Sequence, residues 1–408
     1  MKCGLLGEKL GHSYSPQIHR ELADYEYRLY EKAPEDVENF VRNGDWNGLN
    51  VTIPYKKTVM SFCDELSSLA QEVGSVNTLL KRENGSIFGD NTDAVGFEMM
   101  VESVFPELSA LKGRKALVLG TGGASVAVQA ILRRYEAEVI PVSRSGENNY
   151  HNLDRHGDAL LLVNTTPLGM YPKNGEKAVD LRMFPQLEAV FDVVYNPART
   201  ALLMQAEELG IRNAGGLRML VGQAKRSAEI FLGCNLADSE IERILKKLSF
   251  SMQNIILIGM PGSGKTTIAK LLSEKLGRVC AEADAEIEKQ TGESIPAIFL
   301  KEGESGFRKK ETAVLGELGK QSGLILSTGG GCVTREENYP LLHQNGVIVR
   351  LTRELSKLPR EGRPLSLNAD LNRMAEIRGP MYERFADFSV SNDGSPEETV
   401  KTILEVLT

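Results

Sequence analysis

IILIGMPGSGKTTIAKLL, residues 255–272, determines the fold of the second half of the chain. The apolar run Ile255–Ile258 predicts a buried strand, and Ile268–Leu276 predicts the helix that follows. Between them, Gly259 to Thr266 fits the pattern G-x-x-x-x-G-K-[ST]. A glycine-rich turn between a strand and a helix presents backbone N–H groups to phosphate. The stretch therefore predicts a parallel α/β domain that binds a nucleotide.

The residues of this loop have separate tasks. The ammonium of Lys265 reaches the β- and γ-phosphates of a nucleotide, and the hydroxyl of Thr266 binds Mg²⁺. We therefore expect ATP and Mg²⁺ at this loop. The expected nucleotide contacts are Gly262, Ser263, Gly264, Lys265, Thr266 and Thr267.

A second glycine-rich turn lies in the first half of the chain, in LVLGTGGAS, residues 117–125. Gly120 permits a tight turn after a buried strand, and Gly122 lets backbone N–H groups approach a pyrophosphate. Ser125 stands where the dinucleotide-binding pattern has Gly or Ala, so an ordinary strand-to-helix turn explains the stretch equally well. In the dinucleotide interpretation the cofactor contacts are Gly120, Thr121, Gly122, Gly123, Ala124 and Ser125.

The end of the next strand indicates which dinucleotide would bind. An NAD site usually carries Asp or Glu there, bound to the ribose 2′-OH. Here the strand Val139–Val142 is followed by Ser143, Arg144 and Ser145. A guanidinium with two hydroxyls suits a 2′-phosphate, so these residues predict NADP(H).

Short β-like runs alternate with helical stretches along the chain, which predicts the α/β class with parallel sheets. Glu83–Ser86 contains Asn-Gly between two β-like runs and predicts a tight hairpin. Lys246–Asn254 is polar and follows a helical pattern that ends near Leu248, so we interpret it as an interdomain linker. The other expected strands are Lys115–Leu119, Ala159–Val163, Ala189–Tyr195 and Val347–Leu351.

Composition and charge exclude several classes of protein. The net charge is −7 and neither half has a basic excess, so we expect no nucleic-acid partner. The five cysteines form no C-x-x-C pair, which argues against a disulfide framework or a zinc site and fits a reducing cytosol. The N-terminus does not read as a signal peptide, and no apolar run reaches the ~18 residues of a membrane span. We therefore expect a cytoplasmic protein without membrane contact.

A series of short segments follows in one order between about Cys3 and Leu245: Gly11–His19, Asn50–Lys56, Gly74–Thr78, Gly89–Asp93, Asn164–Met170, Tyr195–Pro197 and Met219–Gln223. In these segments the chain resembles the shikimate dehydrogenase family. The resemblance implies a two-lobed fold with a Rossmann-like NADP lobe, and reduction of 3-dehydroshikimate to shikimate. Lys56 and Asp93 would be the catalytic pair, and Val193 and Gly216 further cofactor contacts. The implied substrate contacts are Ser13, Ser15, Thr52, Asn77, Asp93, Tyr195 and Gln223.

Ketone reduction is consistent with that catalytic pair. Hydride delivery to a carbonyl carbon builds negative charge on the oxygen, which then needs a proton. A partly desolvated lysine can donate that proton, and a neighbouring carboxylate can orient it. Without the resemblance, Lys56 would be a surface lysine, and Asp93 would be the N-cap of a helix over Ala94–Val101.

After the phosphate loop, further segments follow as far as about Leu407: Glu282–Glu288, Gly306–Glu311, Ser327–Gly331, Gly362–Leu365 and Arg378–Tyr382. These resemble the shikimate kinase family, which implies phosphorylation of shikimate by ATP. Lys265 and Arg363 would stabilise the transferring phosphoryl group. The implied shikimate contacts are Asp284, Arg308, Gly330 and Arg378.

Three features depart from the patterns of these families. Glu282 stands where the kinases have Asp near the metal, and we expect it beside Thr266 at the Mg²⁺ site. The kinase lid is short and leaves open whether Arg360 or Arg363 reaches the nucleotide. The loop after Arg144 lacks the second arginine that often accompanies the first, which weakens the expected preference for NADP.

Together these observations predict a bifunctional enzyme of the chorismate pathway. Residues 1–249 would form the dehydrogenase, with a substrate lobe at about 1–105 and 218–249 and an NADP lobe at about 106–217. Residues 253–408 would form a P-loop, nucleoside-kinase-like domain. The substrates would be 3-dehydroshikimate and shikimate, and the resemblance leaves a homodimer open.

Two other functions stay open at this point. The first is a quinate/shikimate dehydrogenase that uses NAD. The second is a catalytically silent metabolite sensor built from both folds. The sensor predicts loss of catalytic side chains, whereas Lys56, Asp93, Lys265 and Arg308 are all present.

Overall fold

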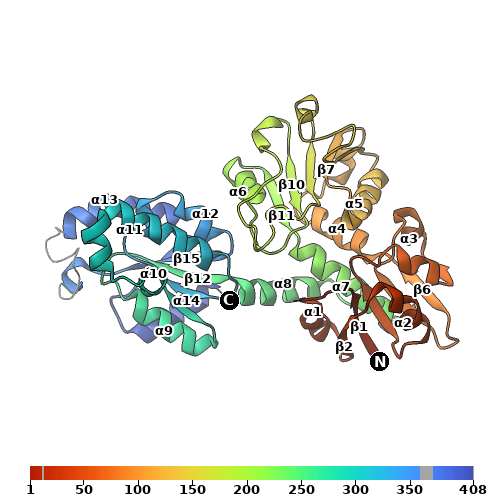
Figure 1. The fold of residues 1–408 in the computed structure, drawn as a ribbon, viewed down its shortest axis with the longest axis horizontal. Helices are drawn as coiled ribbons and strands as arrows, with labels where there is room; N and C mark the ends of the chain where they lie inside the picture. The colour runs from red at the N-terminus through yellow and green to blue at the C-terminus, as the bar shows by residue number, and fades with distance from the viewer. Residues whose placement is uncertain (12, 359–370, 408) are drawn as a thin grey trace. The chain divides into compact units, whose positions relative to one another are not determined.

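The structure is a computed structural model that describes residues 1–11, 13–358 and 371–407. The chain divides into two compact units, each with alternating strands and helices, as the sequence predicts (Figure 1). Among the described helices, none is long and apolar enough to cross a membrane. Unit 1 comprises Met1–Tyr195 and Leu202–Lys247, and unit 2 comprises Asn196–Ala201 and Leu248–Thr408.

The first sheet of unit 1 has six strands: β1 (Lys2–Gly7), β2 (Glu26–Glu31), β3 (Gly48–Val51), β4 (Glu65–Leu66), β5 (Thr78–Lys81) and β6 (Ile87–Asp90). Their order is β2-β1-β3-β5-β6-β4. Neighbouring strands are parallel except at β5, which is antiparallel to both β3 and β6. The turn between β5 and β6 has Gly85 at φ +83°, which confirms the predicted hairpin.

The second sheet of unit 1 has five parallel strands: β7 (Lys115–Leu119), β8 (Glu138–Val142), β9 (Leu161–Asn164), β10 (Ala189–Asp192) and β11 (Arg212–Gly215). Their order is β11-β10-β9-β7-β8, so the chain moves from β7 to one side and then returns to the other. Ligands bind at the carboxyl ends of the strands at such a switch point. The turn that begins at Gly120 follows β7 and lies there.

Eight helices are described from unit 1 into the start of unit 2: α1 (Ser15–Leu22), α2 (Val37–Asn43), α3 (Ser68–Val73), α4 (Thr92–Glu102), α5 (Gly123–Arg134), α6 (Ala201–Glu208), α7 (Leu217–Leu232) and α8 (Ser239–Met252). Helices α4 and α7 touch through glycines. A Cβ on Gly96 would lie 2.4 Å from the carbonyl oxygen of Met219 and 2.9 Å from the backbone nitrogen of Gln223. Only a glycine allows the two helices to approach this closely.

The boundary between the two units falls between Lys247 and Leu248, inside the predicted linker Lys246–Asn254, but the expectation that the helix ends near Leu248 is wrong. The helix continues to Met252, through the polar residues that we interpreted as a linker. Ile241, Ile244, Leu248 and Met252 recur at three- and four-residue spacing, and all four are buried. This apolar stripe keeps the segment helical, because burial of one face outweighs the polar composition of the rest.

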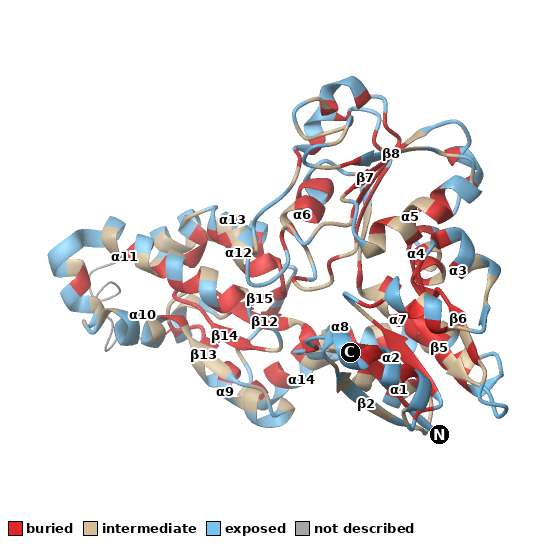
Figure 2. Ribbon diagram, turned by 45° about the vertical axis from the view of Figure 1, so that its right-hand side comes forward, coloured by how far each residue is buried: buried red, intermediate tan, exposed pale blue. Residues whose placement is uncertain are grey.

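The sheet of unit 2 is fully parallel. Its strands are β12 (Asn254–Ile258), β13 (Cys280–Glu282), β14 (Ile325–Ser327), β15 (Gly346–Thr352) and β16 (Phe388–Ser391), in the order β13-β14-β12-β15-β16. Central β12 is buried along its length, as Figure 2 shows in red. Its carboxyl end, where the phosphate loop begins, lies between β14 and β15. The helices are α9 (Lys265–Leu276), α10 (Ala283–Thr291), α11 (Ile295–Gly319), α12 (Asn338–His343), α13 (Leu371–Phe385) and α14 (Pro396–Leu407).

Candidate active sites

The structure brings together the predicted catalytic pair of unit 1. Lys56 lies in the turn after β3, and Asp93 is the second residue of α4. Nζ of Lys56 donates to Oδ2 of Asp93 at 2.5 Å, and the two side chains are only 17% and 11% exposed. Partial burial strengthens such a pair relative to one on the open surface. The lysine ammonium is therefore held in one orientation.

The N-cap of α4 differs from the sequence prediction. The cap is Asn91, whose Oδ1 accepts from the backbone N–H of Ala94 at 3.3 Å, and not Asp93. Both residue types cap helices well, so composition alone could not choose between them. Because Asn91 caps the helix, the Asp93 carboxylate is available to Lys56.

Two predicted substrate contacts lie around Thr92, next to Asp93. Oδ1 of Asn77 accepts from the backbone N–H of Thr92 at 2.7 Å, and the Thr92 hydroxyl donates to Oε1 of Gln223 at 3.5 Å. Behind them, Oγ of Ser227 lies 3.0 Å from the Thr92 hydroxyl and accepts from Nδ2 of Asn50 at 2.7 Å. The sequence analysis missed this buried cluster, because its members are single polar residues far apart along the chain.

The other predicted substrate contacts lie on loops. Oγ of Ser13 accepts from the backbone N–H of Ser15 at 3.2 Å, where α1 begins. Thr52 directly follows β3. The ring of Tyr195 meets Tyr14 edge-on, with 6.0 Å between centroids. Burial raises the pKa of Tyr195, so its hydroxyl remains a neutral donor.

The dinucleotide turn has the features that the sequence predicts for a pyrophosphate. Gly120 has φ +103°, and a Cβ there would lie 2.8 Å from Oγ1 of Thr165. Nothing lies within 4 Å of a Cβ on Gly122, so the space above the turn is open, and neighbouring Thr121 is exposed. The Ser125 side chain is buried and donates to the Gly120 carbonyl at 2.7 Å. Serine at the third motif position therefore braces the turn from inside.

The dinucleotide turn and the Lys56 side chain lie close together, although they come from different lobes of unit 1. A Cβ on Gly123 would lie 3.9 Å from Cδ of Lys56. Near the same switch point, Gly216 packs on the backbone of Val193, because a Cβ there would lie 2.1 Å from the Val193 carbonyl oxygen. A dinucleotide on this turn would thus extend close to the proposed proton donor.

The predicted 2′-phosphate contacts Ser143, Arg144 and Ser145 follow β8 in a closed loop. The backbone N–H of Ser143 donates to the carbonyl of Asn148 at 3.1 Å. Arg144 is exposed and forms no ion pair within the described part of the chain. Arg155, which the sequence analysis did not select, donates to Oδ1 of Asn148 at 2.5 Å. It supports the loop that carries Arg144.

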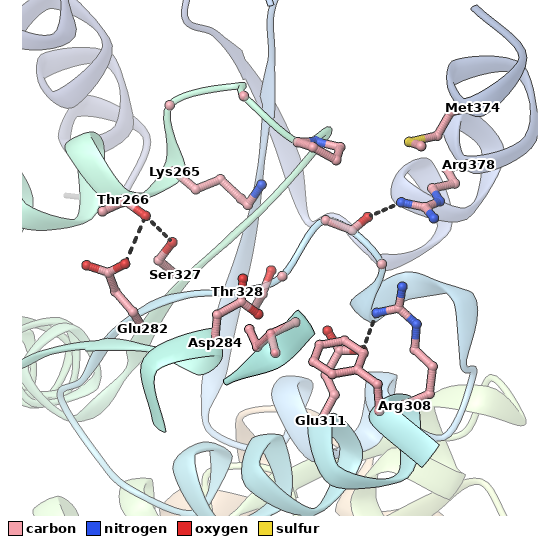
Figure 3. A pocket seen from close by; sticks show the side chains of 18 of the residues that line it. Lys265, Thr266, Glu282, Asp284, Arg308, Glu311, Ser327, Thr328, Met374 and Arg378 are labelled. Carbon is pink, nitrogen blue, oxygen red and sulfur yellow. Dashed lines mark hydrogen bonds and ion pairs between the residues drawn. The ribbon is translucent and has the colours of Figure 1, made fainter. Parts of the chain in front are cut away.

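In unit 2 a cleft of about 760 Å³ opens at the carboxyl end of the sheet (Figure 3). The phosphate loop forms one wall, with Gly259, Gly262 and Gly264 at positive φ. Nζ of Lys265 donates to the carbonyl of Gly259 at 2.9 Å and to that of Met260 at 3.1 Å. The loop therefore holds its own lysine beside the place where phosphates would sit.

The predicted metal residues are in contact with each other. The Thr266 hydroxyl donates to Oε2 of Glu282 at 3.1 Å and lies 3.4 Å from Oγ of Ser327 (Figure 3). The other carboxylate oxygen of Glu282 is 3.3 Å from Nζ of Lys270. Thr266, Glu282 and Ser327 all offer oxygen atoms, the ligand type that Mg²⁺ prefers, so the residues present fit this ion.

Across the cleft, Arg308 forms an ion pair that the sequence analysis overlooked. Its Nη1 donates to Oε2 of Glu311 at 2.7 Å, and both side chains are buried (Figure 3). Burial raises the pKa of the Glu311 carboxyl above its usual range, and the charge of Arg308 offsets only part of this rise. The three-residue spacing of the pair on α11 was the one sequence signal for it.

Asp284 is open to the cleft, on the first turn of α10. The surrounding protein nevertheless reduces its hydration and raises the pKa of its carboxyl, against the opposing charges of Lys265 and Arg308. A raised pKa makes a carboxylate a better acceptor for a hydroxyl proton.

The predicted glycine loop lies against both predicted carboxylate-binding arginines. A Cβ on Gly331 would lie 2.0 Å from Nη2 of Arg308, so no other residue fits without displacing the guanidinium. The carbonyl of Gly330 accepts from Nη1 of Arg378 at 3.1 Å and from the hydroxyl of Tyr382. The sequence analysis did not predict the contact of Tyr382 with this loop. Arg363 lies outside the described residues.

Comparison with known proteins assigns both units. Residues 5–79 match the family model of the shikimate dehydrogenase substrate binding domain. An NADP(+) shikimate dehydrogenase from Clostridium perfringens strain SM101 is 35% identical over 267 residues, which are 60% of this chain and 97% of the relative. The chain belongs to the shikimate dehydrogenase family. Residues 261–408 match the shikimate kinase model, so a kinase domain (unit 2) follows the dehydrogenase domain (unit 1) in one bifunctional enzyme of the shikimate pathway.

Solved structures agree with the dehydrogenase assignment. A chorismate mutase/shikimate 5-dehydrogenase fusion protein from Clostridium acetobutylicum is 36% identical, with a TM-score of 0.55 over 60% of this chain and 96% of that one. A quinate dehydrogenase from Corynebacterium glutamicum in complex with NAD is 26% identical, with a TM-score of 0.55 over 60% of this chain and 98% of that one.

Proposed function

We propose that the dehydrogenase domain reduces 3-dehydroshikimate to shikimate with NADPH, and that the kinase domain phosphorylates shikimate with MgATP to shikimate 3-phosphate. The observation that most supports the first step is the Lys56–Asp93 pair, which faces the dinucleotide turn at Gly123. The product of the first reaction is the substrate of the second, so each assignment supports the other.

In the reductase site, the chain supplies the proton and the orientation. NADPH, when bound, supplies the hydride. Lys56 donates a proton from Nζ to the carbonyl oxygen of the substrate, where negative charge develops. Asp93 holds this ammonium in place, and the amides of Asn77 and Gln223 bind substrate hydroxyls.

In the kinase site, two arginines and one carboxylate hold the acceptor. Arg308 and Arg378 bind the carboxylate of shikimate, since each guanidinium can donate two parallel hydrogen bonds. Asp284 accepts the proton of the attacking hydroxyl. Lys265 and the backbone N–H groups of the phosphate loop stabilise the charge on the transferred group.

A single incubation tests the proposal. The purified chain is mixed with 3-dehydroshikimate, NADPH and MgATP, and shikimate 3-phosphate is measured by mass spectrometry. We expect this product only when both NADPH and ATP are present, and shikimate alone when ATP is left out. A parallel assay with quinate and NAD tests the broader dehydrogenase, which faster turnover there would favour. Binding of the substrates without turnover would favour the sensor.

We predict that Arg144→Ala affects NADPH far more than NADH. Only NADPH carries the 2′-phosphate, and a hydrogen bond to a charged group contributes about 1.5–3 kcal/mol, or about 10- to 100-fold in KM. Initial rates at varied cofactor concentration give both KM values. Lys112→Ala, which removes an exposed cation from the same lobe, serves as the control. Equal increases for NADPH and NADH would show that Arg144 does not discriminate between them.

We also predict that Glu282→Asp lowers the Mg²⁺ concentration needed for half-maximal kinase rate. Glu282 is one methylene longer than Asp, and its two carboxylate oxygens are engaged by Thr266 and Lys270. Mg²⁺ demands near-octahedral geometry, so a shorter carboxylate free of Lys270 should serve it better, with saturated kcat changed by no more than about twofold. Mg²⁺ titrations at saturating ATP and shikimate measure this. A parent chain that is inactive at every Mg²⁺ level, beside an active variant, would contradict kinase function.

A further inference from the structure

Arg353 is a cleft residue that the chemistry above does not use. It directly follows β15 and lines the same cleft as Lys265 and Asp284. Its Nε is buried and has no hydrogen-bond partner among the described residues. A buried N–H of a charged group without an acceptor is costly, and such groups in native proteins have a reason. This side chain is therefore suited to an acceptor that enters the cleft.

The backbone next to Arg353 is tied to the phosphate loop. The carbonyl of Thr352 accepts from the backbone N–H of Asn392 at 2.8 Å, and Nδ2 of Asn392 donates to the carbonyl of Ser263 at 2.8 Å. A Cβ on Gly264 would lie 2.2 Å from that same Nδ2, so the amide packs directly on the loop. The backbone of Arg353 is therefore fixed in position relative to the phosphate loop.

The positive charge of Arg353 is not neutralised by an ion pair. The nearby carboxylates of Glu354 and Asp393 lie 3.4 Å and 3.7 Å from Nζ of Lys357. Arg350, three residues earlier on β15, is paired with Glu383 at 2.9 Å. Arg353 forms no ion pair within the described part of the chain. Hydrogen bonds from Glu354 and Ser391, and then the charges of Lys357 and Arg353, lower the pKa of the Asp393 carboxyl. No carboxylate oxygen of the described residues contacts the Arg353 guanidinium, however, which leaves it available to an anion in the cleft.

The other two arginines among the described lining residues are already engaged. Arg308 is held by Glu311, and Arg378 donates to the carbonyl of Gly330, both on the acceptor side of the cleft. Lys265 is the one cation of the phosphate loop Gly259–Thr266, and it acts as a point charge. A triphosphate carries more negative charge than one ammonium balances.

We propose that Arg353 binds the phosphate chain of the nucleotide, as a second cation beside Lys265. The proposal rests on the kinase function proposed above. A guanidinium presents its donors in a planar fork that matches two phosphate oxygens. Because Arg353 directly follows β15, the neighbour of the strand that leads into the phosphate loop, its side chain starts beside the phosphate-binding backbone.

The test compares Arg353→Met with Arg350→Met in the full chain. Arg350→Met removes the same charge three residues earlier, on β15 itself, from a side chain that does not line the cleft. We expect Arg353→Met to raise the Kd for MgADP, measured by calorimetry, and the KM for ATP about 10- to 100-fold. The KM for shikimate and the reductase rate should stay unchanged, and Arg350→Met should match the parent in every measurement. Unfolding temperatures of both variants verify that the domain remains folded.

Three outcomes would overturn the proposal. An unchanged Kd for MgADP in Arg353→Met would show that the side chain does not meet the nucleotide. A change confined to the KM for shikimate would place it at the acceptor instead. A parent chain that binds no MgADP would refute the proposed kinase function and, with it, the role of Arg353. If the parent chain binds MgADP and phosphorylates shikimate, a failure of the Arg353 prediction concerns Arg353 alone.

Discussion

Lys56→Ala should lower the reductase rate about 10²- to 10⁴-fold and leave the kinase rate unchanged. A positioned proton donor contributes about this much to a reaction that builds charge on oxygen. The structure gives the reason for the position, since Nζ of Lys56 is held by Asp93 at 2.5 Å, and Cδ of the same side chain would lie 3.9 Å from a Cβ on Gly123 of the dinucleotide turn. The loss should fall mainly on kcat, because the hydroxyl contacts of Asn77 and Gln223 remain.

NADPH oxidation and ATP-dependent phosphorylation, measured on the same preparation, check this prediction. Lys57→Ala is the matched control, since Lys57 is the exposed neighbour in the same turn. A reductase rate in Lys56→Ala equal to that of the control would remove Lys56 from the catalytic role. Loss of both activities would instead indicate a folding defect.

Lys265→Met should produce the opposite pattern. We expect the kinase rate to fall about 10²- to 10³-fold, the usual effect of removing one group that stabilises developing charge, with the reductase intact. Lys265 is the buried first residue of α9, and its ammonium is held by two carbonyls of the phosphate loop. Shikimate phosphorylation in a coupled ADP assay measures the effect.

Lys275→Met, on the exposed face of the same helix, controls for the loss of a charge. A kinase rate within about twofold of the control would contradict the assignment of Lys265, because a phosphate-loop lysine acts on the reacting phosphates directly. The two lysine variants together should separate the activities completely. Mixing them should restore production of shikimate 3-phosphate from 3-dehydroshikimate.

Features that depend on neighbouring residues were predictable from the sequence. The strand before each glycine turn was found because buried parallel strands are continuous apolar runs, and β7 was predicted with the observed bounds. The hairpin at Gly85 was found because Asn-Gly tolerates positive φ. The helix through Lys246 was missed, because the apolar stripe that ends in Met252 has only four members over about three turns and was outweighed by the local polar composition.

Contacts between residues far apart in the chain were harder to predict from the sequence. Ser227 and Asn50 meet across 177 positions, and nothing in either segment indicates the other. The bond from the Tyr382 hydroxyl to Gly330 likewise depends on how α13 packs against the glycine loop. Segment resemblance named the residues that would touch ligands, but not the residues that hold them in place.

The glycine contact between α4 and α7 has a consequence for how this reductase could acquire a new substrate. Asp93 begins α4, Gln223 lies on α7, and Gly96 spaces the two helices at van der Waals distance. A larger residue at Gly96 would separate Asp93, which holds the Lys56 ammonium, from Gln223, which we propose binds a substrate hydroxyl. We therefore expect substrate specificity to change through substitutions of side chains that contact the substrate. Substitutions that alter the spacing of α4 and α7 should instead inactivate the reductase.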